Sequence, residues 1–151
     1  MSGWEKKTEW TGRKGRLGAF LMVSPIRRME EALLGCSSTR LIRRVFSSLR
    51  GDAVVLDAGC GSGYLSLPIA ARLDEGKVIC VDLSEEMLAM LRKRAGARAL
   101  GGRVQVLKAP VDSTGLEDAS VDLVVSNNLL HELKEPATAV AGSFSSCRRL
   151  L

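Results

Sequence analysis

The feature that most constrains this chain of 151 residues is a glycine-rich turn that follows a short apolar run. Residues 54–63 read Val-Val-Leu-Asp-Ala-Gly-Cys-Gly-Ser-Gly, so that Asp57 closes the run and Gly59, Gly61 and Gly63 alternate after it. A buried strand that turns sharply into a helix needs such glycines, because they tolerate positive φ and let a ligand approach the backbone. A second apolar run, residues 78–81, ends on another acid, Asp82. The pattern predicts a nucleotide-type site.

Spacing and charge narrow the class of nucleotide. A dinucleotide fingerprint, Gly-x-Gly-x-x-Gly, requires a small residue at its sixth position, and counting from Gly59 that position holds Tyr64. The carboxylate of Asp57 at the turn would repel a pyrophosphate but attract an ammonium group. The site therefore favours a methionine-like moiety, and a nicotinamide oxidoreductase is disfavoured.

The rest of the chain alternates between strand and helix patterns. Runs rich in Val, Leu or Ile predict strands at 53–57, 77–82, 103–107 and 121–126, with helices at 63–73 and 84–99 between them. Ser84 is the expected N-cap of the second helix. Earlier helices are expected from Ser24 to Gly35 and from about Ser38, and a last one from about Pro136. Right-handed crossovers then give an α/β fold, a parallel sheet between two helical layers.

Three motifs in this order resemble a known family. Residues 56–63 (Leu-Asp-Ala-Gly-Cys-Gly-Ser-Gly), 81–88 (Val-Asp-Leu-Ser-Glu-Glu-Met-Leu) and 120–133 (Ser-Val-Asp-Leu-Val-Val-Ser-Asn-Asn-Leu-Leu-His-Glu-Leu) are similar to motifs of the Rossmann-like, class I S-adenosylmethionine-dependent methyltransferases, especially the small-molecule and quinone-type members. The resemblance covers about residues 38–136. It implies a three-layer αβα sandwich with strand order 3-2-1-4, lacking the usual last three strands of the family.

The resemblance also implies a cofactor, S-adenosylmethionine, with S-adenosylhomocysteine as product. The N–H groups of the three glycines and the following helix start are expected to face the carboxylate of the ligand, aided by the helix dipole. Asp57 would orient the ammonium, and Asp82 would accept from both ribose hydroxyls. Leu83 and Met87 would pack on the adenine, although the helical spacing of Met87 suits a core residue equally well.

The adenine edge and the acceptor side involve later residues. Relatives usually carry an acid after the third strand, but Pro110 takes that position here, so Asp112 is the expected substitute and the Val111 N–H is expected to bond a ring nitrogen. Asn127 would face the methionine portion or the reactive methyl. His131, the only histidine, is a candidate general base because its reference pKa is near neutral, with a structural role as the alternative.

Composition sets further expectations. The length and the 46% hydrophobic content suit one domain, which we place at 21–151 behind a mobile basic arm at 1–20. No apolar run is long enough for a membrane span, and the basic start lacks a signal-peptide core, so a cytoplasmic protein is expected. The four cysteines show no paired short spacing, which predicts free thiols and no metal.

Charge and chain length bear on partners. Residues 1–50 carry eleven Lys or Arg against four acids, a balance of +7, whereas residues 51–151 carry eleven against thirteen, a balance of −2. Such a basic front could attract an anionic acceptor, nucleic acid or a membrane, but scattered solvated charge is favoured. The fourth strand is expected at an open sheet edge, which predicts a homodimer or a partner chain there.

The sequence thus supports two functions. The first is methyl transfer from S-adenosylmethionine to an unidentified, small-molecule acceptor. The alternative is a catalytically silent module that binds the cofactor and acts as a subunit or scaffold, because the front motifs report cofactor binding more directly than catalysis.

Overall fold

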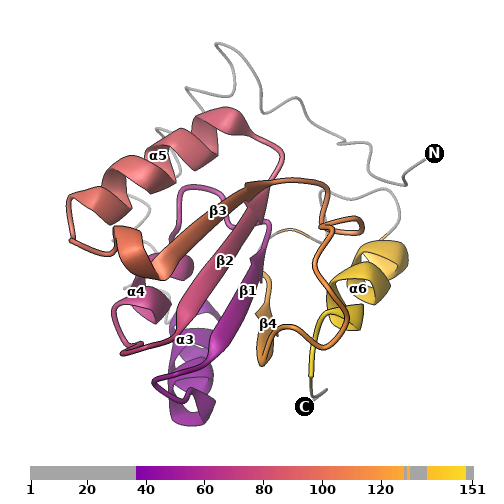
Figure 1. The fold of residues 1–151 in the computed structure, drawn as a ribbon, viewed down its shortest axis with the longest axis horizontal. Coiled ribbons are helices and arrows are strands. Elements are labelled where there is room, and N and C mark those ends of the chain that lie inside the picture. The colour runs from indigo at the N-terminus through magenta and orange to yellow at the C-terminus, as the bar shows by residue number, and fades with distance from the viewer. Residues whose placement is uncertain (1–36, 128, 130–135, 149–151) are drawn as a thin grey trace.

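The computed structural model of the protein describes residues 37–127, 129 and 136–148. The predicted arm at 1–20 and the helix predicted from Ser24 lie outside the described residues. In chain order the elements are α3 (Ser37–Ser48), β1 (Val54–Ala58), α4 (Ser66–Ala70), β2 (Lys77–Asp82), α5 (Glu85–Gly96), the 3-10 turn η1 (Gly101–Arg103), β3 (Val104–Lys108), β4 (Leu123–Val125) and α6 (Pro136–Ser145). Figure 1 shows their arrangement.

The four strands form one parallel sheet with the order β3-β2-β1-β4, as predicted. The strand β1 is central, because it pairs with β2 on one side and with β4 on the other. The predicted bounds of β1, β2 and β3 agree within one residue, whereas β4 begins at Leu123 rather than Val121. Val121 instead forms an isolated parallel bridge with Cys147.

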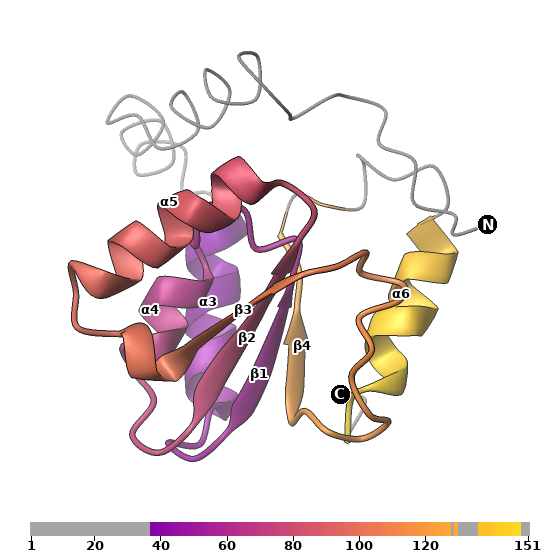
Figure 2. The same cartoon turned by 45° about the horizontal axis from the view of Figure 1, so that its top comes forward.

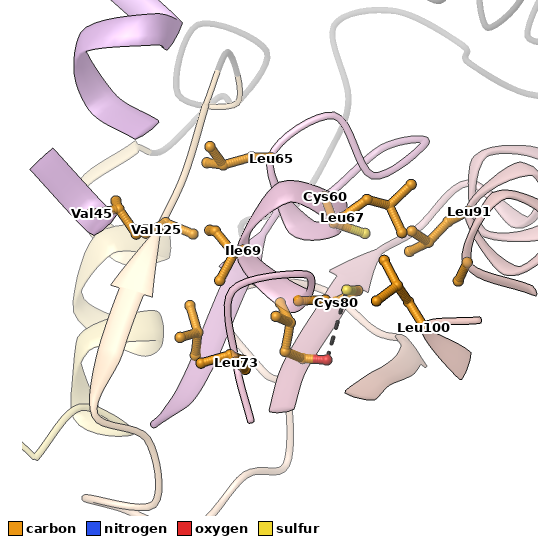
Figure 3. Packing of buried hydrophobic residues seen from close by; sticks show 14 of the residues in the cluster. Val45, Cys60, Leu65, Leu67, Ile69, Leu73, Cys80, Leu91, Leu100 and Val125 are labelled. Atoms are coloured by element: carbon orange, nitrogen blue, oxygen red, sulfur yellow. Dashed lines mark hydrogen bonds between the residues drawn. The ribbon is translucent and has the colours of Figure 1, made fainter. Parts of the chain in front are cut away.

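Successive side chains of the central strands point to opposite faces of the sheet, as the two-residue period of a strand requires. On one face Val55, Val78 and Cys80 join a core cluster with residues of α3, α4 and α5. Figure 3 shows this packing, with Val45 of α3 and Leu91 of α5 among the labelled side chains. This cluster holds α3, α4 and α5 against this face of the sheet.

The second face holds a smaller apolar cluster. Its buried members from the sheet are Leu56, Ala58, Ile79 and Val81, and Val111 and Val121 from the loops pack with them. Figure 2 shows α6 beside β4, on the side of the sheet away from α3, α4 and α5. The described structure therefore has the two helical layers that the resemblance implied.

The helix after the glycine turn is shorter than predicted. The sequence predicts a helix over 63–73, but α4 spans only Ser66–Ala70, and turns occupy residues 61–65. The three glycines all have positive φ, between 51° and 82°, a conformation that does not continue into a helix. The α5 prediction is close: Ser84 is its N-cap, and its hydroxyl accepts from the Met87 N–H at 3.4 Å.

The edge beyond β4 is covered in part. The Val121 N–H donates to the Ser146 carbonyl at 2.9 Å, and the Arg148 N–H donates to the Val121 carbonyl at 2.7 Å. Asp122 holds this segment, since one carboxylate oxygen accepts from Val54 N–H at 2.9 Å and the other lies 3.1 Å from Arg148 Nη1. The chain after α6 therefore runs along the residues just before β4. The homodimer or partner chain at this edge stays a prediction.

The described cysteines are free thiols. Cys60 and Cys80 are buried in the first core cluster, where they pack as apolar side chains. A hydrogen bond with Cys80 and burial raise the pKa of Cys60 well above its usual value, which keeps the thiol protonated. No group of three metal-ligating side chains occurs among the described residues, and none of the described helices has the length and apolar character of a membrane span.

Candidate functional site

Two acids lie at the carboxyl ends of adjacent parallel strands. Asp57 is next to last in β1 and Asp82 is the last residue of β2. Asp57 pairs in register with Cys80, so the alternation of the strands directs Asp57 and Asp82 to the same face of the sheet. Ligands of open α/β folds bind outside the carboxyl ends of the strands, where these two acids lie.

Asp57 is a buried acid without a cationic partner among the described residues. Only 1% of the residue is exposed, and the Ser66 hydroxyl of α4 donates to its Oδ2 at 2.5 Å. Burial raises the pKa of Asp57 to about 6, the nearby charge of Asp82 adds to the rise, and the Ser66 hydrogen bond opposes it. A cation bound beside Asp57 would favour the ionised form of the carboxyl group, because the opposite charge compensates for the solvation that is lost on burial.

Asp82 is held by two backbone amides. Its Oδ2 accepts from the Gly61 N–H at 2.9 Å, and its Oδ1 accepts from the Ser84 N–H at 2.8 Å. Each carboxylate oxygen has a second lone pair, so the pair of oxygens can still accept two further hydrogen bonds. The carboxylate is thus fixed in orientation before any ligand arrives.

In the glycine loop, residues 59–64, close packing leaves no room for a side chain at two of the glycines. A Cβ on Gly63 would lie 2.2 Å from Leu91 Cδ1, and a Cβ on Gly59 would lie 2.8 Å from Leu129 Cδ1. A Cβ on Gly61 would meet nothing within 4 Å among the described residues. Gly61 therefore leaves open space beside the loop.

The three glycine amides of the loop all have acceptors within the described structure. Gly59 N–H donates to the Val81 carbonyl at 2.9 Å, Gly61 N–H to Asp82, and Gly63 N–H to the Cys60 carbonyl at 3.0 Å. The helix dipole is also a weak argument here, because α4 has only five residues. The glycines shape the loop, and whether they bind a ligand stays a prediction.

The two apolar candidates follow Asp82 on the chain. Leu83 is partly buried after β2, and Met87 in the first turn of α5 is 6% exposed. Leu88 and Leu91 of the same helix belong to the first core cluster, whereas Met87 is a member of neither cluster. Met87 is nevertheless buried like Leu88 and Leu91, and its adenine role stays a prediction.

The loop after β3 carries the candidates for the adenine edge. Val111 is fully buried in the second cluster, and the neighbouring Asp112 is partly buried. Asp112 Oδ1 is inaccessible to solvent and has no hydrogen-bond partner in the part of the chain that the structure describes. A buried acceptor without a donor is costly, so a ligand donor at this atom would be favourable.

The last two candidates follow β4. Asn127 is partly buried, next to Ser126, whose hydroxyl donates to the Ala58 carbonyl at 2.9 Å and ties the ends of β4 and β1 together. His131 lies outside the described residues, so its role stays a prediction.

Sequence reasoning missed three residues that shape the site: Ser66, Leu129 and Arg94. Ser66 had no sequence signal, since its bond to Asp57 depends on where α4 packs. Leu129 follows Asn127 closely in one of the three motifs, yet only the tertiary structure places it against Gly59. Arg94 has the pattern of an ordinary surface charge, but its Nη1 donates to the Ser62 carbonyl at 2.7 Å and to Ser62 Oγ at 3.1 Å.

Comparisons with known proteins point in one direction. A family profile described as Methyltransferase domain matches residues 55–151. The malonyl-[acyl-carrier protein] O-methyltransferase of Methylovorus sp. (strain MP688) is 34% identical over 94 residues, which are 58% of this chain and 31% of that protein. The chain spans less than half the length of the curated relatives that it matches.

Solved structures share the fold. An S-adenosylmethionine-dependent methyltransferase of Aquifex aeolicus superposes with a TM-score of 0.71 at 23% identity, over 87% of this chain and 66% of that one. The magnesium protoporphyrin IX methyltransferase of Synechocystis PCC 6803 was solved with bound S-adenosylhomocysteine. It gives a TM-score of 0.65 at 21% identity, over 75% of this chain and 51% of that one.

Proposed function

We propose that this chain, which belongs to the class I S-adenosylmethionine-dependent methyltransferases, binds S-adenosylmethionine and transfers a methyl group to a small-molecule acceptor. The observation that carries the proposal is the pair of acids at the ends of β1 and β2 and the contrast between them. Asp57 is buried with a raised pKa, and Asp82 is partly exposed and fixed by two amides. One acid suits a cation and the other suits hydroxyl donors.

Asp57 is the proposed partner of the ammonium group. Its burial makes a charge pair there stronger than it would be in water, and its Oδ1 is not used by the Ser66 hydroxyl. Asp82 is the proposed acceptor for the two ribose hydroxyls, because both of its oxygens keep a lone pair after the bonds from Gly61 and Ser84. Gly59, Gly61 and Gly63 would line the tail of the ligand.

The adenine moiety would lie between Leu83 and Met87 on one side and the loop after β3 on the other. The orphaned Asp112 Oδ1 fits the exocyclic amine of adenine, which is a donor. The Val111 amide is proposed to bond a ring nitrogen. These residues are the ones that can hold the cofactor, and the buried unpaired oxygen is the observation that supports the fit.

The transfer itself needs little side-chain chemistry. When bound, S-adenosylmethionine supplies a sulfonium methyl group that an acceptor atom takes, which leaves S-adenosylhomocysteine and releases the acceptor's proton. The chain mainly aligns the acceptor, and Asn127 would border that position. His131 is the proposed recipient of the proton. The name of the Methylovorus relative supports an oxygen acceptor.

The silent module stays the second candidate, because the motifs at the strand ends report cofactor binding more directly than catalysis. Both candidates require the cofactor site, and only the first requires turnover. No observation on the described residues favours the module over the enzyme.

Calorimetric titration with S-adenosylmethionine, S-adenosylhomocysteine and NAD tests the site. We expect binding of the first two and none of NAD. The Asp57→Asn and Asp82→Asn variants should each lose most of the affinity, whereas Asp52→Asn, an equally conservative change at an exposed acid paired with Arg50, should bind normally. Binding of NAD, or equal affinities in all three variants, would refute the proposed site.

Release of S-adenosylhomocysteine in the presence of a metabolite pool separates the enzyme from the silent module. For an identified acceptor, His131→Ala should lower turnover most near neutral pH, where an imidazole is unprotonated and hydroxide is still scarce. Turnover within a few-fold of the wild type across pH 6 to 9 would remove His131 from the mechanism.

A further inference from the structure

The last turn of α5 is joined to the glycine loop by one side chain. Arg94, in the last turn of α5, donates through Nη1 to the carbonyl of Ser62 at 2.7 Å and to its Oγ at 3.1 Å. Ser62 lies in the glycine loop, 32 residues earlier in the chain, and is 8% exposed. A guanidinium bond to a largely buried carbonyl is a charge-assisted hydrogen bond, which is stronger than a neutral one.

The same helix also holds the other end of the site. At its start, the Ser84 N–H donates to Asp82 and the Ser84 hydroxyl caps the Met87 N–H. Near its middle, Leu91 packs so closely on Gly63 that no Cβ fits between them. The helix α5 therefore touches the proposed adenosine end at its first turn and the glycine loop through Leu91 and Arg94.

We propose that Arg94 is a positioning residue, which holds the glycine loop at a fixed separation from Asp82 and so gives the site its affinity for the amino-acid tail of the ligand. The inference rests on the proposed function, because the tail is assigned to the loop and the ribose to Asp82. Asp82 keeps its bonds from the Ser84 and Gly61 N–H groups when Arg94 is lost, so the adenosine end stays formed while the loop loosens around Ser62. A preorganised loop binds its ligand better because less order is lost on binding.

A pair of ligands separates the two ends of the site. S-Adenosylhomocysteine carries the amino-acid tail, and 5′-methylthioadenosine lacks it. In Arg94→Gln we expect the affinity for S-adenosylhomocysteine to fall about tenfold, the factor that the loss of one charge-assisted hydrogen bond gives. The affinity for 5′-methylthioadenosine should stay within about twofold. Arg94→Lys, which keeps a charged donor, should recover part of the loss.

Arg92→Gln is the matched control. Arg92 lies on the same helix and pairs with the exposed Glu85 instead of the loop, so both affinities should match the wild type. Urea unfolding of each variant checks that it is folded, and Arg94→Lys carries the test if Arg94→Gln does not fold. In either variant, an unchanged affinity for S-adenosylhomocysteine, or equal losses for both ligands, would overturn the inference. A wild type that binds neither ligand would refute the proposed function itself, and the inference with it.

Discussion

The tight contact between Gly63 and Leu91 gives a quantitative prediction for Gly63→Ala. The new Cβ would lie 2.2 Å from Leu91 Cδ1, and Leu91 cannot swing away cheaply because it is fully buried in the first core cluster. Overpacking of this kind costs about 1 to 3 kcal/mol. The positive φ of 82° adds about 1 to 2 kcal/mol for any residue with a Cβ. The free energy of unfolding should therefore fall by about 2 to 5 kcal/mol.

Gly61→Ala is the matched comparison. Its φ is also positive, at 51°, but a Cβ there meets nothing within 4 Å among the described residues. The stability cost should be only the backbone cost, about 1 to 2 kcal/mol. Because the new methyl group enters the open space beside the loop, we expect the affinity for S-adenosylhomocysteine to fall although the protein remains well folded.

A double-mutant cycle isolates the contact. Leu91→Ala alone should cost about 2 to 5 kcal/mol, because it empties a buried position. In the double variant Gly63→Ala with Leu91→Ala the overlap is gone, so the total cost should be about 1 to 3 kcal/mol less than the sum. Urea unfolding with an unchanged m value measures each corner of the cycle. Equal costs for the two glycine variants, or additivity within about 0.5 kcal/mol, would refute the packing argument.

Three further outcomes are expected. Because the pKa of Asp57 is raised from 3.8 to about 6, the stability that its protonated form gives is full below 3.8 and is lost as pH rises through 6. Asp57→Asn, which can keep the Ser66 bond, should therefore stabilise the protein at pH 7.5 by about 3 kcal/mol while losing cofactor affinity. Thermal unfolding measures this stability, and a variant less stable than the wild type would contradict the prediction. In the wild type, the affinity for S-adenosylhomocysteine should fall about tenfold from pH 7 to 5, and a flat titration series would exclude Asp57 as the ammonium partner. Asp122→Ala should lower stability by about 1 to 3 kcal/mol, because the Val54 N–H and Arg148 lose their acceptor, without changing ligand affinity.

The predicted partner at the edge of β4 is tested by sedimentation. A homodimer or a bound partner chain is expected at high concentration, and a clean monomer would contradict that expectation. The edge in question is Leu123–Val125, since the segment after α6 already covers Val121.

The strands and the two acids at their ends are predictable from local patterns in the amino-acid sequence, whereas the strand order came from the resemblance to the methyltransferase family. Those signals are local: an apolar run fixes a buried strand, and a carboxylate at its end is already at the ligand edge of a parallel sheet. Asp57 and Asp82 are therefore predictable from the sequence alone. The length of α4 is not, because positive φ at three neighbouring glycines depends on the turn that tertiary packing selects.

The pairing of hydrogen-bond donors with acceptors at the site depends on the tertiary structure. In the described structure the glycine amides bond Val81, Asp82 and Cys60, because the loop folds back on the end of β2. Ser66 reaches Asp57, and Arg94 reaches Ser62, across separations of 9 and 32 residues. Contacts between distant residues depend on how helices dock on the sheet, and no local pattern in the chain encodes that docking. The sequence thus predicts the residue types of the site, whereas their hydrogen bonds and burial depend on the fold.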